Sequence, residues 1–153
     1  MMLNDILYSI REHLKTDPDV EANEVLTYYD GLVLDNREKP FIVVESLFDD
    51  FEVLAAGRTD YEETYALQIG IRAESEHQLN KLKRTVTRSL RKKVTLYNTS
   101  TEPFAASGFF YVDVDRVEVV RPDDISRETD FHRAYITAEV TVNFDNTSGG
   151  FTQ

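Results

Sequence analysis

The sequence predicts one α+β domain, in which a largely antiparallel (mixed) β-sheet has helices packed on one face. Two segments have apolar residues at helical spacing, and two long segments alternate between apolar and polar residues as half-buried strands do. Helices and strands do not alternate regularly along the chain, which disfavours a parallel α/β sheet. We expect residues 1–144 to form this domain and residues 145–153, which include two consecutive glycines, to form a flexible C-terminal tail.

Composition and charge narrow the class of protein. A chain of 153 residues with 41% hydrophobic content is long enough for one core but not for two full domains. It has no cysteine, which excludes a disulfide framework, a thiolate zinc site and a cysteine nucleophile. The net charge of -11 argues against nonspecific binding to nucleic acid phosphates, although an acidic wall can line a passage for DNA.

The first predicted element is an amphipathic helix near the N-terminus. Its apolar face contains Leu3, Ile6, Leu7, Ile10 and Leu14. Asp5, Arg11 and Glu12 interrupt the apolar residues, so we expect no signal peptide, no membrane span and a soluble protein. The helix should stop before Asp17 and Pro18, because a residue that precedes proline disfavours helical geometry. Residues 17–30 have no clear period and receive no assignment.

Four strand-like segments follow. Residues 32–34 and 41–44 are short aliphatic runs around a polar turn, and residues 51–55 form a third short run. The fourth segment is a long strand over residues 61–73. On one face of this strand lie Tyr65, Leu67, Ile69 and Ile71. That face should therefore be buried.

A second helix should begin at Ser75. Ser75 and Gln78 form a capping-box pattern, and Glu74 and Glu76 place negative charge at the positive end of the helix dipole. The apolar stripe of this helix contains Leu79, Leu82, Val86, Leu90 and Val94. The stripe predicts that the helix packs on the sheet and extends to Val94.

The last third of the chain predicts a loop and two strands. Residues 98–108 are rich in Ser, Thr, Pro and Gly, which is typical of a long projecting loop. Residues 109–121 form a strand whose alternation changes phase midway, which indicates a bulge or a strand covered on both faces. Residues 131–144 form a strand whose apolar face contains Ala134, Ile136, Ala138, Val140, Val142 and Phe144.

We searched the sequence for residues that carry out catalysis and find no convincing set. His13, His77 and His132 are not at metal-ligand spacing. Asp113 and Asp115 alternate on a strand and could together hold a hard cation, but alternating acids are also common on solvated strand faces, and we favour that interpretation. No glycine-rich phosphate loop or activated serine is present. We therefore expect no cofactor, no bound metal and no enzymatic activity; a small metal-dependent enzyme that uses the two aspartates is the alternative.

The second helix carries one distinctive feature, a basic face opposite its apolar stripe. Its members are Lys81, Arg84, Arg88, Arg91 and Lys92. This face has three interpretations: a solvated helix surface, a local phosphate contact, or a contact with another subunit. In a chain of net charge -11, these cations complement the acidic surface of a second copy. We therefore expect them to face a neighbouring subunit or another partner.

Taken together, five segments resemble the tail terminator, or tail completion, proteins of long-tailed bacteriophages and related viruses. These segments are MLNDILYSIREHL, PFIVVES, YEETYALQIGIRAESEHQLNKLKRTVTRSL, FFYVDVDRVEVVRPDD and FHRAYITAEVTVNF, and the likeness spans roughly residues 3–144. The pronounced acidity and the long segment over residues 98–108 depart from the family's pattern.

The resemblance implies a structural virion protein of the neck, assembled in the host cytoplasm. It implies a homohexameric ring that caps the tail tube, ends tail polymerisation and joins the tail to the head connector. The partners would be other copies of the chain, the tail tube protein and a head-side connector or stopper protein, with DNA passing through the lumen without specific binding and no membrane contact. Another neck ring subunit, a head completion or stopper protein, is the alternative.

The resemblance and the composition together identify a candidate docking loop, which would project toward a partner ring. Its members are Asn98, Thr99, Ser100, Thr101, Glu102, Pro103, Phe104 and Gly108.

Overall fold

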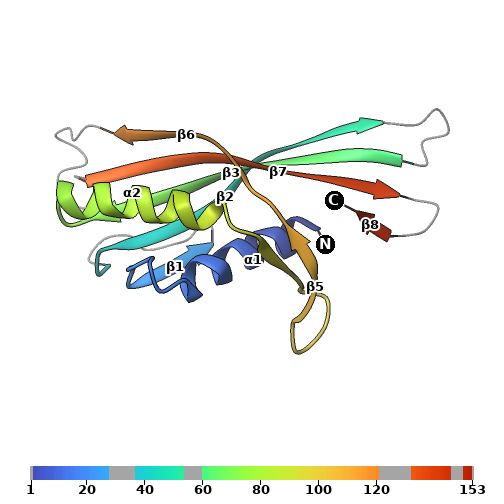
Figure 1. Ribbon diagram of the computed structural model, residues 1–153, viewed down its shortest axis with the longest axis horizontal. Coiled ribbons are helices and arrows are strands. Elements are labelled where there is room, and N and C mark those ends of the chain that lie inside the picture. Colours follow the sequence, from blue (N-terminus) through green and yellow to red (C-terminus); the bar gives the residue numbers. More distant parts are fainter. Residues whose placement is uncertain (1, 28–36, 54–59, 121–131, 146–149, 153) are drawn as a thin grey trace.

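The computed structural model describes residues 2–27, 37–53, 60–120, 132–145 and 150–152. Within these residues the chain has two helices, α1 (Met2–Thr16) and α2 (Glu76–Leu90), and a large mixed, mostly antiparallel sheet. Both helices lie on the same side of this sheet (Figure 1). The predicted α+β class, with helices on one face, is confirmed.

The main sheet has the strand order β1-β2-β3-β7-β6. Its strands are β1 (Glu24–Thr27), β2 (Phe41–Val53), β3 (Asp60–Ala73), β6 (Asp113–Val120) and β7 (His132–Asp145), and β8 (Gly150–Thr152) pairs with the end of β7. The β1–β2 pair is parallel, and the other pairs of this sheet are antiparallel. A separate hairpin consists of β4 (Val94–Asn98) and β5 (Ala105–Phe110).

The β3–β7 pair forms the centre of the sheet and runs in register over the full length of both strands. On its helix-facing side, Tyr65 lies opposite Val140 and Ile69 lies opposite Ile136, and all four side chains are buried. Because alternate residues of a strand face opposite sides, the predicted apolar faces of both strands are buried together as far as Val142; the side chain of Phe144 lies outside the described part. The two long strands were therefore predicted correctly.

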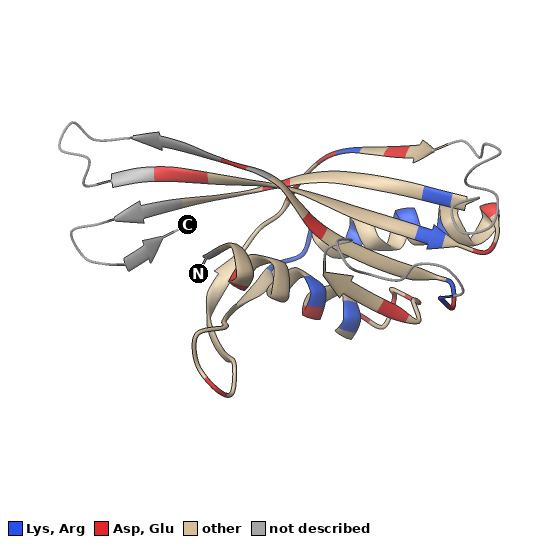
Figure 2. Cartoon of the chain, turned by 180° about the vertical axis from the view of Figure 1, so that it is seen from behind, with Lys and Arg blue, Asp and Glu red and all other residues tan. Residues whose placement is uncertain are grey.

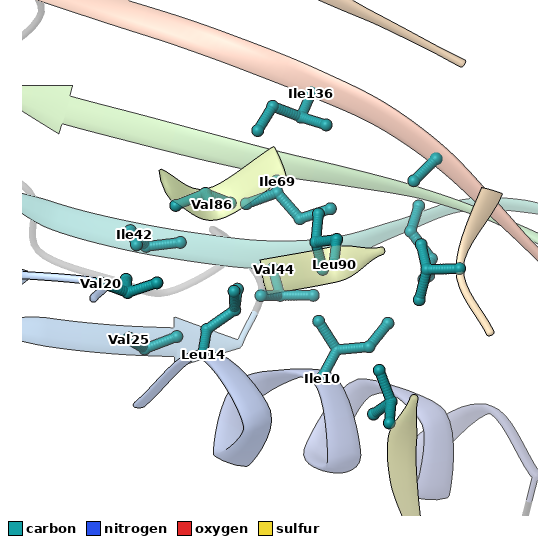
Figure 3. Packing of buried hydrophobic residues seen from close by; sticks show 14 of the residues in the cluster. Ile10, Leu14, Val20, Val25, Ile42, Val44, Ile69, Val86, Leu90 and Ile136 are labelled. Carbon is teal, nitrogen blue, oxygen red and sulfur yellow. The ribbon is translucent and has the colours of Figure 1, made fainter. Parts of the chain in front are cut away.

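The core lies between the helices and the sheet. In α1 the side chains of Ile6, Ile10 and Leu14 are fully buried, and in α2 those of Val86 and Leu90 are fully buried. Figure 3 shows Ile10, Leu14, Val86 and Leu90 pointing toward Ile42, Val44, Ile69 and Ile136 of the sheet. The amphipathic spacing of both helices is thus explained by burial of one face against the sheet.

The second helix begins as predicted but ends earlier. The Ser75 hydroxyl accepts a hydrogen bond of 3.1 Å from the Gln78 backbone N–H, and the Gln78 side-chain oxygen accepts one of 2.8 Å from the Glu74 N–H. The helix ends at Leu90, so the prediction that it extends to Val94 was wrong. Val94 is buried as the first residue of β4, opposite Phe110. Its apolar side chain fits the helical stripe and the strand equally well, so spacing alone could not separate the two.

Two other boundaries differ from the prediction. β2 extends to Val53, so residues 51–53 belong to β2 and not to a separate strand, and residues 54–55 of that prediction lie outside the described residues. The predicted strand over residues 109–121 is divided between the two sheets, because β5 ends at Phe110 and β6 begins at Asp113. The predicted bulge is present in β6, where the register shifts between Val114 and Arg116.

The segments with the weakest patterns also contain structure. The unassigned residues 17–30 include β1, and residues 145–153, expected to form a flexible tail, include β8, which pairs with β7. The predicted strand over residues 32–34 lies outside the described residues.

Replacing Ser75 with alanine should lower the free energy of unfolding by about 1 kcal/mol, because the first turn of α2 loses its N-cap acceptor. Urea unfolding followed by circular dichroism measures this change. Ser100→Ala is the matched control, since Ser100 is exposed and its hydroxyl makes no hydrogen bond to the described residues. Equal stability of the two variants would contradict a role for the cap.

Candidate functional site

The predicted basic face divides into paired and unpaired cations. The Lys81 ammonium lies 3.2 Å from a carboxylate oxygen of Glu21, and the Lys92 ammonium lies 3.2 Å from one of Asp17. Both ion pairs connect α2 and the residue that follows it closely, Lys92, with the segment after α1 that contains Asp17 and Glu21. These two lysines therefore contribute less positive charge to the outer surface than the sequence suggested.

The remaining cations form one wall of an open groove between α2 and β6. Arg84, Arg88 and Arg91, the other predicted members, are exposed. Lys83, which the prediction did not include, is half-buried beside them. Within the described part of the chain none of these four side chains forms an ion pair. The groove has a volume of about 470 Å³ and is also lined by Asn80, Thr87 and Val117. We call it the basic groove. It concentrates unneutralised positive charge on a chain of net charge -11.

The other wall of the basic groove is an open sheet edge. Val117 of β6 lies in register with the buried Ile136 on the helix-facing side of the sheet, yet its side chain is 38% exposed. Val119 follows on the same side and is 51% exposed. In the described residues β6 pairs with β7 alone, so its outer backbone edge has no strand partner (Figure 1). An edge strand of this kind is a template for adding another strand.

Basic and acidic residues are unevenly distributed over the molecule, although β6 beside the basic groove carries three exposed acids, Asp113, Asp115 and Glu118. Figure 2 shows basic residues on α2 and acidic residues along the strands that extend beyond the helices. In that extension, Glu62 and Glu63 of β3 and Asp49 of β2 lie near one another in the register of the β2–β3 pair. One molecule thus presents a basic surface and an acidic surface in different places.

Asp17 is a buried anchor for the basic end of α2. The Asp19 backbone N–H donates a hydrogen bond of 3.0 Å to its carboxylate. The Ser89 hydroxyl, the Asp19 N–H and Lys92 lower the pKa of Asp17 from 3.8 to about 2, while desolvation acts in the opposite direction. The Ser89 oxygen has no hydrogen-bond partner of normal geometry, so we attribute its effect to the dipole of the hydroxyl. Asp17 therefore stays charged at neutral pH and fixes Lys92.

The predicted docking loop is a β-hairpin rather than a long loop. Asn98 ends β4, residues 99–104 form the turn, and Gly108 lies in β5. Gly108 has a positive φ of 157° beside the register shift between Leu96 and Tyr97, a position that favours glycine. The turn chemistry was read correctly, but the alternating pattern on each side is too short to predict strands.

The hairpin is fixed to α1. The Asp5 carboxylate accepts hydrogen bonds from the Thr99 backbone N–H at 2.9 Å and from the Thr99 hydroxyl at 2.6 Å. The Ser9 hydroxyl accepts another from the Tyr97 N–H at 2.9 Å. The Phe104 ring packs edge-to-face on Tyr8, with 4.9 Å between centroids. The hairpin is therefore held by α1, while Ser100, Thr101, Glu102 and Pro103 of its turn are exposed.

The sequence interpretation missed an exposed aromatic patch beside this hairpin. Phe109 and Tyr111 are 44% and 52% exposed, and their rings lie edge-to-face at 5.8 Å. The Lys93 ammonium lies 4.7 Å from the Phe109 ring centroid. The signal was the alternation of these residues with the buried Phe110 and Val112.

The structure does not bring the predicted metal candidates together. Asp113 and Asp115 are exposed, and the bulge in β6 falls at Asp115, which interrupts the alternation that would place both on one face. The ring nitrogen Nε2 of His13 lies 2.7 Å from the Ser89 backbone oxygen, which ties α1 to α2. No group of three or more His, Asp or Glu side chains suited to a metal ion occurs among the described residues.

In the part of the chain that the structure describes, neither helix is both long and apolar enough to cross a bilayer. Comparison with models of known protein families gives no match, and comparison with curated proteins finds no similar sequence.

Replacing Asp17 with asparagine should lower the free energy of unfolding by about 2 kcal/mol at pH 7, as the pKa difference implies. Because the folded-state pKa is lowered, the contribution is complete above pH 3.8 and is lost as the pH falls toward about 2. Urea unfolding of both proteins across this range measures it. Asp19→Asn, at an exposed position, is the control; a stability difference that did not shrink in acid would contradict this account.

Replacing Asp5 with alanine should loosen the hairpin, because Thr99 loses an acceptor for two hydrogen bonds. We expect roughly ten-fold faster hydrogen exchange at the Thr99 amide. Asn4→Ala, an exposed change on the same helix, should leave exchange unchanged. Equal exchange in the two variants would show that Asp5 does not hold the hairpin.

Proposed function

We propose that this protein is a tail terminator (tail completion) protein of a long-tailed bacteriophage or related virus. It forms a homohexameric ring in the virion neck, caps the tail tube, ends tail polymerisation and joins the tail to the head connector. The proposal rests on the five resembling sequence segments and on one structural observation, the unneutralised basic groove beside an open strand edge.

The basic groove supports assembly because its cations have no acidic partner within the described chain, although the chain has many acids. Such cations are available to pair with acids of another copy. Lys81 and Lys92 have such internal partners, whereas Arg84, Arg88 and Arg91 have none among the described residues. A contact between this groove and a different, acidic surface of the next copy is head-to-tail. Repeated by rotation, it closes into a ring with two unlike faces, one for the tube and one for the head side.

The hairpin and the lumen have separate roles in this proposal. The exposed turn of the hairpin and the aromatic patch offer a docking surface for the tube protein or the connector, since exposed aromatic side chains are frequent in interfaces. An excess of acidic residues facing the lumen would let DNA pass without binding.

Replacing Arg84 and Arg88 with glutamate should weaken ring assembly, because two unpaired cations become anions within the groove. We expect the oligomer to shift toward monomer in light scattering at a concentration where the unchanged protein is assembled. Lys81→Glu is the matched control, because Lys81 already pairs with Glu21 and lies outside the basic groove. An unchanged oligomer in the double variant would contradict the assembly role of this face.

Particle mass and negative-stain images test the wider function. A six-fold ring about as wide as a phage tail supports a neck ring subunit, and its position in the virion separates a tail terminator from a head completion or stopper protein.

A further inference from the structure

The cations of the basic groove repel one another. Arg84 and Arg88 of α2 and Arg91, its C-cap, follow at spacings of four and three residues, which places like charges side by side on one helix face. Lys83 adds a fourth charge to the groove, and none of the four side chains forms an ion pair within the described residues. An anion bound among these side chains would remove the repulsion.

The acids of β6 do not neutralise the groove. Val117 lies on the helix-facing side of the sheet and lines the groove. Glu118, the next residue, faces the other side, where its carboxylate lies 3.3 Å from the Arg116 guanidinium. Asp113 faces that other side too, because it lies opposite Glu139, whose neighbours in β7 are buried against the helices. Among the described residues, no Asp or Glu lines the groove.

The length and the donors of the groove fit a short chain of phosphates. From Arg84 to Arg91 the helix rises about 10 Å, so one small anion cannot contact all three arginines at once. A guanidinium donates paired hydrogen bonds to phosphate oxygens, and a diphosphate or triphosphate presents such oxygens in a row. The groove volume of about 470 Å³ is typical of sites for small ligands. Val117, which is 38% exposed, adds an apolar wall that a nucleoside can cover.

A long polyanion fits this surface less well than a short one. The chain has 28 acidic and 17 basic residues, and Figure 2 shows acidic residues on the strands that extend beyond α2. A nucleic acid duplex that extends past the groove brings its phosphates near these acids, and the repulsion opposes binding. A short anion that ends within the groove avoids this repulsion.

We propose that the basic groove is a binding site for a short polyphosphate, either inorganic or carried by a nucleotide. The binding itself goes beyond the proposed function, whereas its consequence rests on that function. A bound polyphosphate occupies the arginines that contact an acidic surface of the next copy, so it opposes assembly of the ring. The groove thus holds either a free anion or a neighbouring subunit.

Isothermal titration calorimetry with sodium tripolyphosphate tests the site, at a dilution where light scattering finds monomer. Arg84→Gln with Arg88→Gln should weaken binding about a hundred-fold, because two charge-assisted contacts are lost. Glutamine keeps the helix propensity of arginine, so α2 should stay folded in circular dichroism. The control, Lys15→Gln with Lys81→Gln, removes the same charge outside the groove and should retain binding within about three-fold, since distant charges are screened. Absence of binding, or equal loss in both double variants, overturns the proposal.

Further titrations identify the source of the phosphate chain. Adenosine triphosphate that binds more tightly than tripolyphosphate assigns the site to a nucleotide, and Val117→Thr should then remove the difference. Equal binding of the two assigns it to the phosphate chain alone. Sulfate at the same ionic strength should bind about ten-fold more weakly or less, because it reaches fewer of the arginines. Sulfate or a short DNA duplex that binds as well as tripolyphosphate overturns the proposal.

Light scattering of the unchanged protein separates this inference from the proposed function. Saturating tripolyphosphate should shift the ring toward monomer, compared with sodium chloride at the same ionic strength. A ring that persists with polyphosphate bound overturns the competition and leaves the anion site standing. A ring whose dilute monomer binds no polyphosphate overturns the site and leaves the proposed function standing. A chain that binds polyphosphate but stays monomeric at high concentration without it supports the site and overturns the ring.

Discussion

The antiparallel pairing of β3 with β7 is the constraint on which the remaining structure depends. Its fourteen residue pairs span about 48 Å, whereas the fifteen residues of α2 span about 22 Å. The helices can therefore cover only about half of the sheet, and Figure 1 shows the ends of β2, β3 and β7 extending past them. One end of the β3–β7 pair packs against the helices and forms the core. The other end extends beyond the helices, and few of the described elements cover it.

Long elements with many buried residues could be predicted from the sequence, whereas short elements could not. The apolar and polar residues alternate over the whole of β3 and β7, which indicates a strand. The apolar residues of α1 keep helical spacing over several turns, which indicates a helix. β1 has only four residues, and the strands of the hairpin have five and six, too few to establish a period. Val94 shows the limit most clearly, because a buried residue after a helix fits the helical stripe whether or not the helix continues.

The sequence predicted most of the cations of the candidate site but not the acidic residues with which some of them pair. The pairs that neutralise Lys81 and Lys92 join residues 60 and 75 positions apart, and no local pattern announces such contacts. The same holds for Val117: its apolar residue type predicts burial, whereas its place on the outermost strand leaves it exposed at the edge of the groove. Of the five predicted cations, only the three arginines remain without an ion pair among the described residues, and the basic groove adds Lys83, which the prediction did not include.

In the proposed assembly, the position of the basic groove would give association between copies a direction. Two copies of a strongly acidic chain repel each other in most orientations, and the repulsion opposes random contact between exposed strand edges. Only an orientation that places an acidic surface against the basic groove removes the repulsion, and because the two surfaces differ, that orientation is head-to-tail. In such a contact the open edge of β6 would add backbone hydrogen bonds. If the protein assembles as we propose, its acidic composition and the strand edge that is unpaired among the described residues would together favour an ordered ring over aggregation.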